Sequence, residues 1–289
     1  AVPLFAYHFL TTGGTTLSAG LEASGADSAN FLNLMKNGDG SNNIVSVISG
    51  LGWGLGYFGM PHILVRFMAV RDEKEMTKSK ATAISWVALS LGFAVFIDIL
   101  GRAYLPELVN GNNEKVFIEM IKKVFTVEMR APFIAGLFLC GILAAIMSTA
   151  DSQLLVSASS VAEDIFKGLL KKDADDKTVM NVSRITVLVV AVLAYIIAWN
   201  PNNTVMGLVS NAWAGLGAAF GPLVVMSLYW KRTNFPGAVA GIVTGALAVI
   251  IWDYIPLVGG QTLGKATGLY SLVVGFGLGL IAIIAVSLT

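Results

Sequence analysis

Charged side chains are scarce in this chain. Lys, Arg, Asp and Glu together make up 13% of its 289 residues, whereas a soluble domain has about 25%. Hydrophobic residues make up 55% of the chain, and the mean hydropathy is +0.74. This composition predicts an integral membrane protein.

Cysteine and histidine are scarcer still. Cys140 is the only cysteine, which excludes an internal disulfide and a cysteine-based metal site. The two histidines, His8 and His62, lie far apart and do not suggest a metal site. The formal net charge of +1 gives no reason to expect a nucleic-acid partner. Since the sequence also has no phosphate loop and no nucleophile–base set, we expect neither an enzyme nor a bound cofactor.

Long apolar runs are abundant instead. A membrane-spanning helix needs about 20 mostly apolar residues, and the sequence predicts about eight such spans. These cover residues about 1–20, 44–69, 81–105, 131–160, 179–199, 204–229, 236–255 and 267–288. The segment at about 112–130 has its apolar residues on one face, which predicts an interfacial or loop helix. Because the chain starts inside an apolar run, we expect 1–289 to be a single transmembrane fragment of a longer protein, without its N-terminal spans.

The distribution of Lys and Arg predicts the orientation, because cytoplasmic loops carry an excess of both. If the spans alternate, the segments 66–80, 167–184 and 231–232 lie on one side of the membrane. That side holds 12 of the 19 basic residues: Arg66, Arg71, Lys74, Lys78, Lys80, Lys167, Lys171, Lys172, Lys177, Arg184, Lys231 and Arg232. We therefore expect a multi-pass protein of the cell membrane, with these segments cytoplasmic and the segments 22–43 and 106–130 extracellular.

A stripe of small and hydroxyl side chains interrupts the apolar run at 131–160. Ala145, Ser148, Thr149 and Ser152 are spaced i, i+3, i+4 and i+7, so they share one face of a helix. Such a stripe can let another helix approach closely, or it can offer oxygen ligands to a small cation. Membrane Ser and Thr also commonly bond back to their own helix. The spacing alone leaves these alternatives open.

The run at 44–69 is rich in glycine and predicts a broken helix. Five glycines and Pro61 fall within residues 50–62, and in a membrane a broken helix is tolerated where its freed backbone is buried or lines a cavity. Trp53, Tyr57 and Pro61 are spaced i, i+4 and i+8, which would suit the floor of a site for a small solute. The alternative is that the glycines only permit close helix packing.

Three acids lie within or near the predicted spans. Asp151 follows the hydroxyl stripe and is either an ion ligand or a residue of an aqueous vestibule. Asp98 lies one turn from Arg102, which would be its simplest partner. Asp253 is near a span end, where we expect it to be solvated. The small residues of the run at 204–229, including Gly217 and Gly221, predict a close-packing face.

Three motifs, in order, resemble the sodium:solute symporter family. They are GWGLGYFGMPHILVRFMA from Gly52, ILAAIMSTADSQLLVSASSVAEDI from Ile142 and GLVSNAWAGLGAAFGPLVV from Gly207. The basic residue Arg232, followed after four residues by Gly237-Ala238 and then by a small and apolar run to Gly245, matches a further signature of that family. The resemblance is greatest to its sodium/proline symporters and runs from about residue 44 to the end.

The resemblance implies an all-α integral membrane protein that forms the C-terminal part of an inverted-repeat, LeuT-like transporter fold. It also implies that the Ala145 carbonyl and the Ser148 and Thr149 hydroxyls bind Na⁺, with further ligands from outside this chain. Trp53, Tyr57 and Pro61 match the family's solute-facing positions. The expected function is sodium-coupled symport of a small solute, most closely L-proline, into the cell. The expected partners are the solute, Na⁺ and the lipid bilayer.

Other functions remain open at the level of sequence. The same fold could take up another amino acid or a carboxylate, or it could serve as the sensing domain of a membrane histidine kinase. A passive channel is less consistent with polar residues that gather at one depth. The sequence does not predict an oligomeric state.

Overall fold

The computed structural model describes residues 1–37, 40–110, 113–200 and 204–289. The chain divides into two compact units. One unit comprises Ala1–Asn43 and Val70–Ala150, and the other comprises Ile44–Ala69 and Asp151–Thr289. Each unit is discontinuous in sequence, because the segment 44–69 packs with the second half of the chain. The long helix α8 contributes residues to both units.

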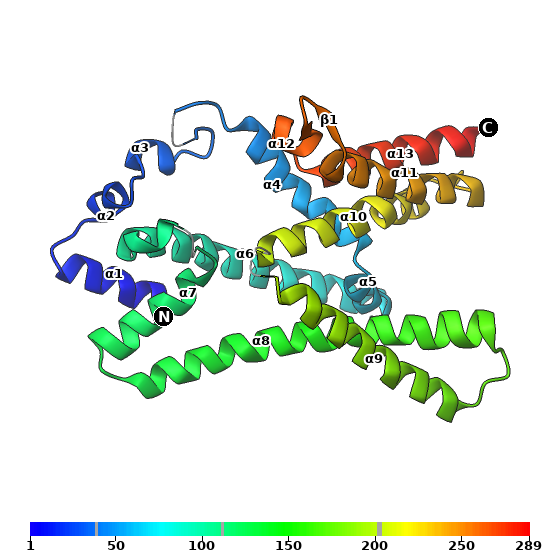
Figure 1. Ribbon diagram of the computed structural model, residues 1–289, viewed down its shortest axis with the longest axis horizontal. Helices are drawn as coiled ribbons and strands as arrows, with labels where there is room; N and C mark the ends of the chain where they lie inside the picture. The colour runs from blue at the N-terminus through cyan, green and yellow to red at the C-terminus, as the bar shows by residue number, and fades with distance from the viewer. Residues whose placement is uncertain (38–39, 111–112, 201–203) are drawn as a thin grey trace. The chain divides into compact units, whose positions relative to one another are not determined.

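The regular elements in the described part of the first unit are helices, apart from one isolated bridge between Lys36 and Asn42 (Figure 1). The unit contains α1 (Val2–Thr12), α2 (Leu17–Ala23), α3 (Ser28–Phe31), α6 (Glu73–Tyr104), the 3-10 turns η2 (Pro106–Asn110) and η3 (Asn113–Lys115), α7 (Val116–Ile121), the π-helical η4 (Lys122–Glu128) and most of α8 (Pro132–Ser159).

One apolar core holds this unit together. It joins α1, α2, the C-terminal turns of α6, and α7 with η4. Its largest fully buried side chains are Leu21, Leu100, Met120, Ile121, Val124 and Phe125. Each fully buried side chain of this size contributes about 1.5–3 kcal/mol of transfer free energy. The core therefore holds α7 and η4, which connect α6 to α8, against α1, α2 and the end of α6.

The structure differs from the predicted span at about 1–20. That stretch forms two helices, α1 of 11 residues and α2 of 7 residues, each too short to cross a bilayer. Gly14 between them has φ +78°, a left-handed conformation that glycine adopts without strain. The Thr16 hydroxyl then accepts a hydrogen bond from the Ala19 amide and caps α2. These local signals end the first helix, although the apolar composition continues.

The segment predicted as an interfacial or loop helix at about 112–130 folds as α7 followed by η4. Met120, Ile121, Val124 and Phe125 are buried in the core of the unit. The apolar face of this segment therefore packs against protein.

The second unit contains the broken span and the C-terminal helices (Figure 1). Its elements are α4 (Ile44–Gly56), η1 (Tyr57–Gly59), α5 (Pro61–Met68), the end of α8, the π-helical η5 (Ser160–Leu170), α9 (Asp176–Ala198), α10 (Val205–Tyr229), α11 (Phe235–Tyr254), the strand pair β1 (Pro256–Val258) and β2 (Gln261–Thr262), α12 (Leu263–Thr267) and α13 (Ser271–Leu288).

Small residues bring α10, α11 and α13 into close contact. Ala214, Ala218 and Leu272 are fully buried where these helices meet. A Cβ on Gly275 of α13 would lie 2.7 Å from the Ala218 Cβ, so the helices can pack this closely only because the position is glycine. The predicted close-packing face of the run at 204–229 is thus present.

Six helices in the described residues are long and apolar enough to span a membrane: Lys74–Tyr104, Pro132–Leu170, Asp176–Ala198, Val205–Tyr229, Phe235–Tyr254 and Ser271–Leu288. The bent pair Ile44–Gly59 and Pro61–Met68 would be a seventh. The apolar window of α9 has none of its residues buried, as expected of a helix whose sides face lipid or other helices. The chain is thus an all-α multi-pass membrane protein, whose described residues hold six candidate spans, or seven with the bent pair, where the sequence predicted about eight.

Candidate functional site

The run at 44–69 is a broken helix, as its glycines and proline predict. The axis bends by 57° between the two halves. Met60 has an extended backbone with ψ 111°, which the following Pro61 favours on steric grounds. Pro61 itself begins α5, where its missing N–H costs nothing. At the break, Gly59 lies so close to α10 that a Cβ on it would be 2.7 Å from the Gly217 Cα.

Four aromatic rings gather beside this break. Trp53 stacks on Tyr270 with ring centroids 5.4 Å apart, and on its other partner Trp213 at 6.0 Å. Tyr57 meets Trp213 edge-on at 5.0 Å. The Trp213 indole N–H donates a hydrogen bond to the Trp53 carbonyl, with an N···O distance of 2.9 Å. We call these four residues the aromatic cluster. Tyr57 is 54% exposed, so one face of the cluster is open.

An open cavity of about 440 Å³ adjoins the aromatic cluster. Its lining includes Trp53, Tyr270, Asn211, Ser210 and Asp253. Asp253, expected to be solvated, is half-buried and accepts a hydrogen bond of 2.5 Å from the buried Ser271 hydroxyl. The volume of the cavity lies within the range of sites for small ligands. Pro61 is exposed at the start of α5 and does not line this cavity.

The hydroxyl stripe lies in the middle of α8. Ala145, Ser148 and Thr149 are exposed on that helix. The Thr149 hydroxyl donates to the Ala145 carbonyl at 3.2 Å, which is the common back-bonded arrangement. Two oxygen ligands about 2.4 Å from one hard cation, at a right angle, lie about 3.4 Å apart. The spacing of these two oxygens is therefore compatible with joint binding of one ion, once the hydroxyl proton turns away.

The fourth residue of the stripe has a partner that the sequence did not predict. The Arg66 guanidinium, in the last turn of α5, donates to the Ser152 hydroxyl at 3.3 Å. The neighbouring Asp151 is exposed and, with Ser152, lines an open cavity of about 380 Å³. Ser152 is thus a contact between α5 and α8.

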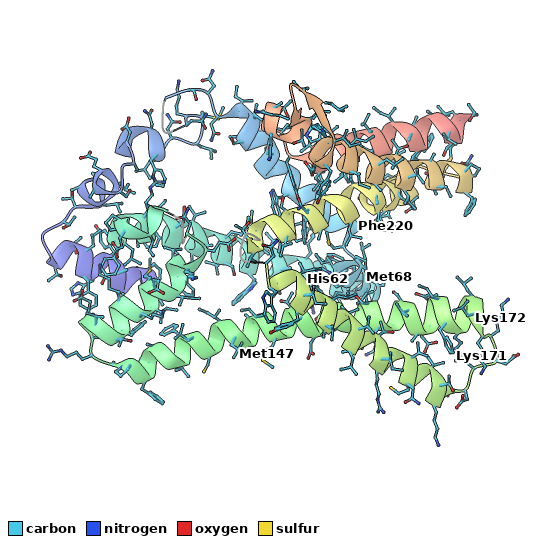
Figure 2. All side chains as sticks on the ribbon, in the orientation of Figure 1. His62, Met68, Met147, Lys171, Lys172 and Phe220 are labelled. Atoms are coloured by element: carbon cyan, nitrogen blue, oxygen red, sulfur yellow. The ribbon has the colours of Figure 1, made fainter. Side chains whose placement is uncertain are left out.

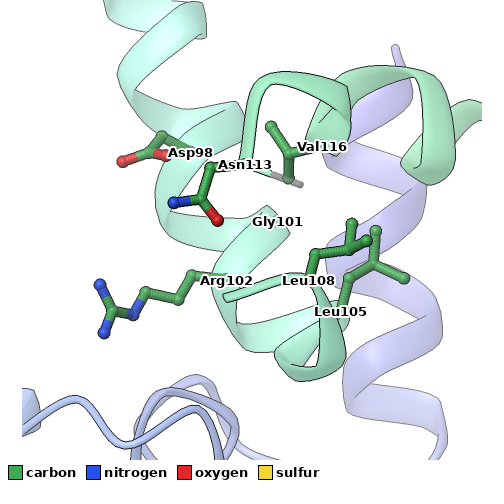
Figure 3. A pocket seen from close by; sticks show the side chains of 7 residues that line it. All are labelled: Asp98, Gly101, Arg102, Leu105, Leu108, Asn113 and Val116. Carbon is green, nitrogen blue, oxygen red and sulfur yellow. The ribbon is translucent and has the colours of Figure 1, made fainter. Parts of the chain in front are cut away.

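The predicted pairing of Asp98 with Arg102 is wrong. No ion pair within 4.0 Å joins them in the structure, although they lie one turn apart on α6. Arg102 instead donates to the Ser24 hydroxyl at 3.1 Å and lies over the Phe31 ring at 4.8 Å. Figure 3 shows both side chains leaving successive turns of α6, beside a cavity of about 100 Å³ that Asn113 also lines. The segment that contains Ser24 and Phe31 thus binds the guanidinium in place of Asp98.

The described residues hold no group of three or more His, Cys, Asp and Glu side chains that could bind a metal. The sequence profile of the sodium:solute symporter family matches residues 3–245 of the chain. The chain belongs to the sodium:solute symporter family. This confirms the resemblance of the three motifs, and it places the chain among transport proteins and not among enzymes.

Similar relatives of known activity are proline transporters. The chain is 45% identical over 252 residues to the sodium/proline symporter of Escherichia coli (strain K12), covering 85% of this chain and 47% of the relative. It is 43% identical over 246 residues to the osmoregulated proline transporter OpuE of Bacillus subtilis (strain 168), covering 85% and 48%. The chain therefore spans about half the length of the curated relatives it matches. No solved structure matches it.

Trp213 and Tyr270 are members of the aromatic cluster that sequence reasoning missed. They come from α10 and from the residue before α13, far from Trp53 in the sequence. Tyr270 lies near a span end, where an aromatic residue usually indicates a membrane-interface belt, and Trp213 lies inside the separate run at 204–229, so periodicity gave no reason to group them. In this member of the symporter family, packing of α10 and α13 against α4 brings the rings together.

Proposed function

We propose that this chain is part of a sodium-coupled symporter that carries a small organic solute, L-proline, into the cell. The observation that carries the proposal is the family membership, with 41–45% identity to transporters named for proline. The aromatic cluster and the hydroxyl stripe supply two sites of suitable chemistry. The partners of the whole protein are then the solute, Na⁺ as coupling ion and the lipid bilayer, with no organic cofactor.

Sodium binds at the hydroxyl stripe. The Ala145 carbonyl and the Ser148 and Thr149 hydroxyls provide uncharged oxygens, which hold a monovalent cation without trapping it. Several more oxygens are needed, and they come from other parts of the whole protein. The adjacent back-bonded oxygens of Ala145 and Thr149 support this role because their spacing suits a shared ion.

The solute binds at the aromatic cluster beside the helix break. Trp53 and Tyr57 present ring faces and edges to the apolar part of the solute, and an ammonium group can lie against an aromatic face. Pro61 contributes by starting α5 and so by holding the break open. The open cavity, which Asn211 and Ser210 line together with Trp53, gives the zwitterion a path to the cluster.

Sodium and solute binding are coupled, because each ligand changes the affinity of the protein for the other by the same factor. If Na⁺ stabilises the outward-open state, it raises the affinity for the solute, typically by about 1–3 kcal/mol, and the solute raises the affinity for Na⁺ equally. Rocking of helix groups about the fixed sites then exposes both to the cytoplasm. One charge that moves through 100 mV contributes about 2.3 kcal/mol. The sodium gradient thus drives the solute inward.

The protein lies in the cell membrane with its most basic segments on the cytoplasmic side. Lys171 and Lys172 are exposed in the turn between η5 and α9 (Figure 2), within the segment 167–184. The segments 66–80 and 231–232 lie on the same side, and 22–43 and 106–130 lie outside. The excess of Lys and Arg supports this orientation.

The test is solute uptake by the full-length protein, reconstituted into vesicles, with proline and a panel of other amino acids, carboxylates and sugars. We expect uptake of proline that requires an inward sodium gradient and stops when potassium replaces sodium. Uptake of another solute with proline excluded would contradict the choice of solute. Uptake that ignores the sodium gradient would contradict the symport mechanism.

A further inference from the structure

The indole N–H of Trp213 bonds to the backbone of another helix close to the break in the span α4–α5. Trp53 lies in the last turn of α4, which ends at Gly56. The helix continues directly into the 3-10 turn η1, where the span then breaks. The Trp213 N–H, on α10, donates to the Trp53 carbonyl at 2.9 Å. A side chain on one helix is thus bonded to the backbone of another one turn before the break.

Glycine lets the Trp213 ring reach this position. A Cβ on Gly56 would lie 2.7 Å from the Trp213 Cε2, so any other residue at position 56 would collide with the indole. The ring then stacks on Trp53 and meets the edge of Tyr57. Both candidate solute-binding rings therefore contact one residue of α10, and one of them is also held through its own backbone.

We infer that Trp213 is a positioning residue for the solute site, acting through Trp53. The inference rests on the proposed function, because Trp53 must contact the solute for its placement to matter. The indole N–H fixes the backbone at Trp53, and the stacked rings of Trp213 and Tyr270 fix its side chain. Trp213 determines how tightly the zwitterionic solute is held, and it leaves Na⁺ binding on α8 unaffected.

The experiment compares Trp213→Phe with Trp252→Phe in the full-length protein. Trp213→Phe keeps an aromatic ring and removes the N–H. Trp252→Phe is the matched control, since the Trp252 indole also donates to a backbone carbonyl, that of Leu269, at 3.0 Å and makes none of the ring contacts of the aromatic cluster. We expect Trp213→Phe to raise the KM for proline about three- to tenfold, the range expected for one hydrogen bond. Vmax and the half-saturating sodium concentration stay within about twofold of wild type, as does every parameter of Trp252→Phe.

A second arm separates positioning from general damage. In a Trp53→Ala background there is no ring to place, so adding Trp213→Phe should change proline affinity by less than about twofold. Trp213→Tyr, which also lacks the indole N–H, replaces Trp213→Phe if the latter does not reach the membrane. An unchanged KM in Trp213→Phe, an equal rise in Trp252→Phe, or a full additional loss in the Trp53→Ala background would overturn the inference. Wild-type protein that takes up no proline with sodium would instead contradict the proposed function, on which this inference depends.

Discussion

At the scale of single residues, the Thr149 hydroxyl makes a hydrogen bond within its own helix and is also a proposed sodium ligand. It bonds back to the Ala145 carbonyl and so costs the helix no unsatisfied polar group. The distance between the same two oxygens also suits the proposed sodium site, in which the hydroxyl proton would turn away from the carbonyl.

The sodium assignment predicts the effect of Ser148→Ala and Thr149→Ala. Each substitution removes one uncharged oxygen from the ion, which should raise the half-saturating sodium concentration about ten- to hundredfold. The measurement is sodium dependence of proline uptake by the full-length protein. Thr186→Ala is the control, because the Thr186 hydroxyl makes the same back-bond on α9, to Val182 at 2.8 Å. An unchanged half-saturating sodium concentration in both α8 variants would contradict the role of these hydroxyls as sodium ligands.

The solute assignment predicts the effect of Tyr57→Ala. Removing an exposed ring that meets Trp213 edge-on should weaken proline binding about tenfold or more and change sodium binding much less. Tyr195→Ala is the control, since Tyr195 meets Trp199 edge-on at 5.4 Å on α9 and is similarly exposed. Binding isotherms for proline and for sodium on the purified protein check both statements. Equal loss in the two variants would show that Tyr57 has only a structural role.

At the scale of elements, the break in the span α4–α5 depends on glycines that lie against α10. Gly59 has no room for a Cβ, because the backbone of α10 at Leu216 and Gly217 occupies that space. Gly54, five residues earlier, has open space around it. The glycines of this run therefore have different roles, although the sequence pattern treats them alike.

This difference predicts opposite effects of two similar substitutions. Gly59→Ala should destabilise the protein by about 1–3 kcal/mol, as overpacking against a rigid backbone does. Gly54→Ala should be neutral or stabilising by up to about 1 kcal/mol, since alanine favours a helix interior. Thermal unfolding of the two variants in the same detergent checks the order. A Gly59→Ala protein as stable as Gly54→Ala would mean that the close approach to α10 is unnecessary.

The elements also show why the first predicted span differs. The apolar composition of residues 1–20 suits a span, but Gly13 and Gly14 with the capping Thr16 end one helix and start another. The sequence contains these turn and capping residues, but hydropathy alone predicts one continuous span. In the run at 44–69, Gly and Pro predict a break, and the break is present.

At the scale of the whole molecule, the proposed orientation can be tested through the lone cysteine. Cys140 is exposed and is the only cysteine of these 289 residues, so Cys140→Ser, together with replacement of any cysteine elsewhere in the full-length protein, gives a cysteine-free background. Cysteine introduced at Lys171 should react with a membrane-impermeant maleimide only after the cytoplasmic face is opened. Cysteine at Asn33, in the segment 22–43 that is proposed to lie outside, should react in intact cells. Labelling of both from the same side would contradict the alternation of spans.

The sequence by itself determined the membrane class, the broken helix and the apolar runs that form the six candidate spans. These depend on composition, periodicity and local backbone preferences, all of which can be read from short stretches of the chain. The family followed from the resemblance of three motifs. The sequence also placed Ala145, Ser148 and Thr149 on one helix face, because that relation is a property of a single helix.

Only the tertiary structure decided which distant side chains meet. Arg102 contacts Ser24 and Phe31 and not the nearby Asp98, and Arg66 contacts Ser152. Trp213 and Tyr270 join Trp53 from other helices. Such contacts depend on which helices pack together. Small residues in the sequence allow close packing, but they do not determine which helix is the partner. The composition of the aromatic cluster is therefore set by the meeting of α4, α10 and α13, and no segment of the chain encodes it alone.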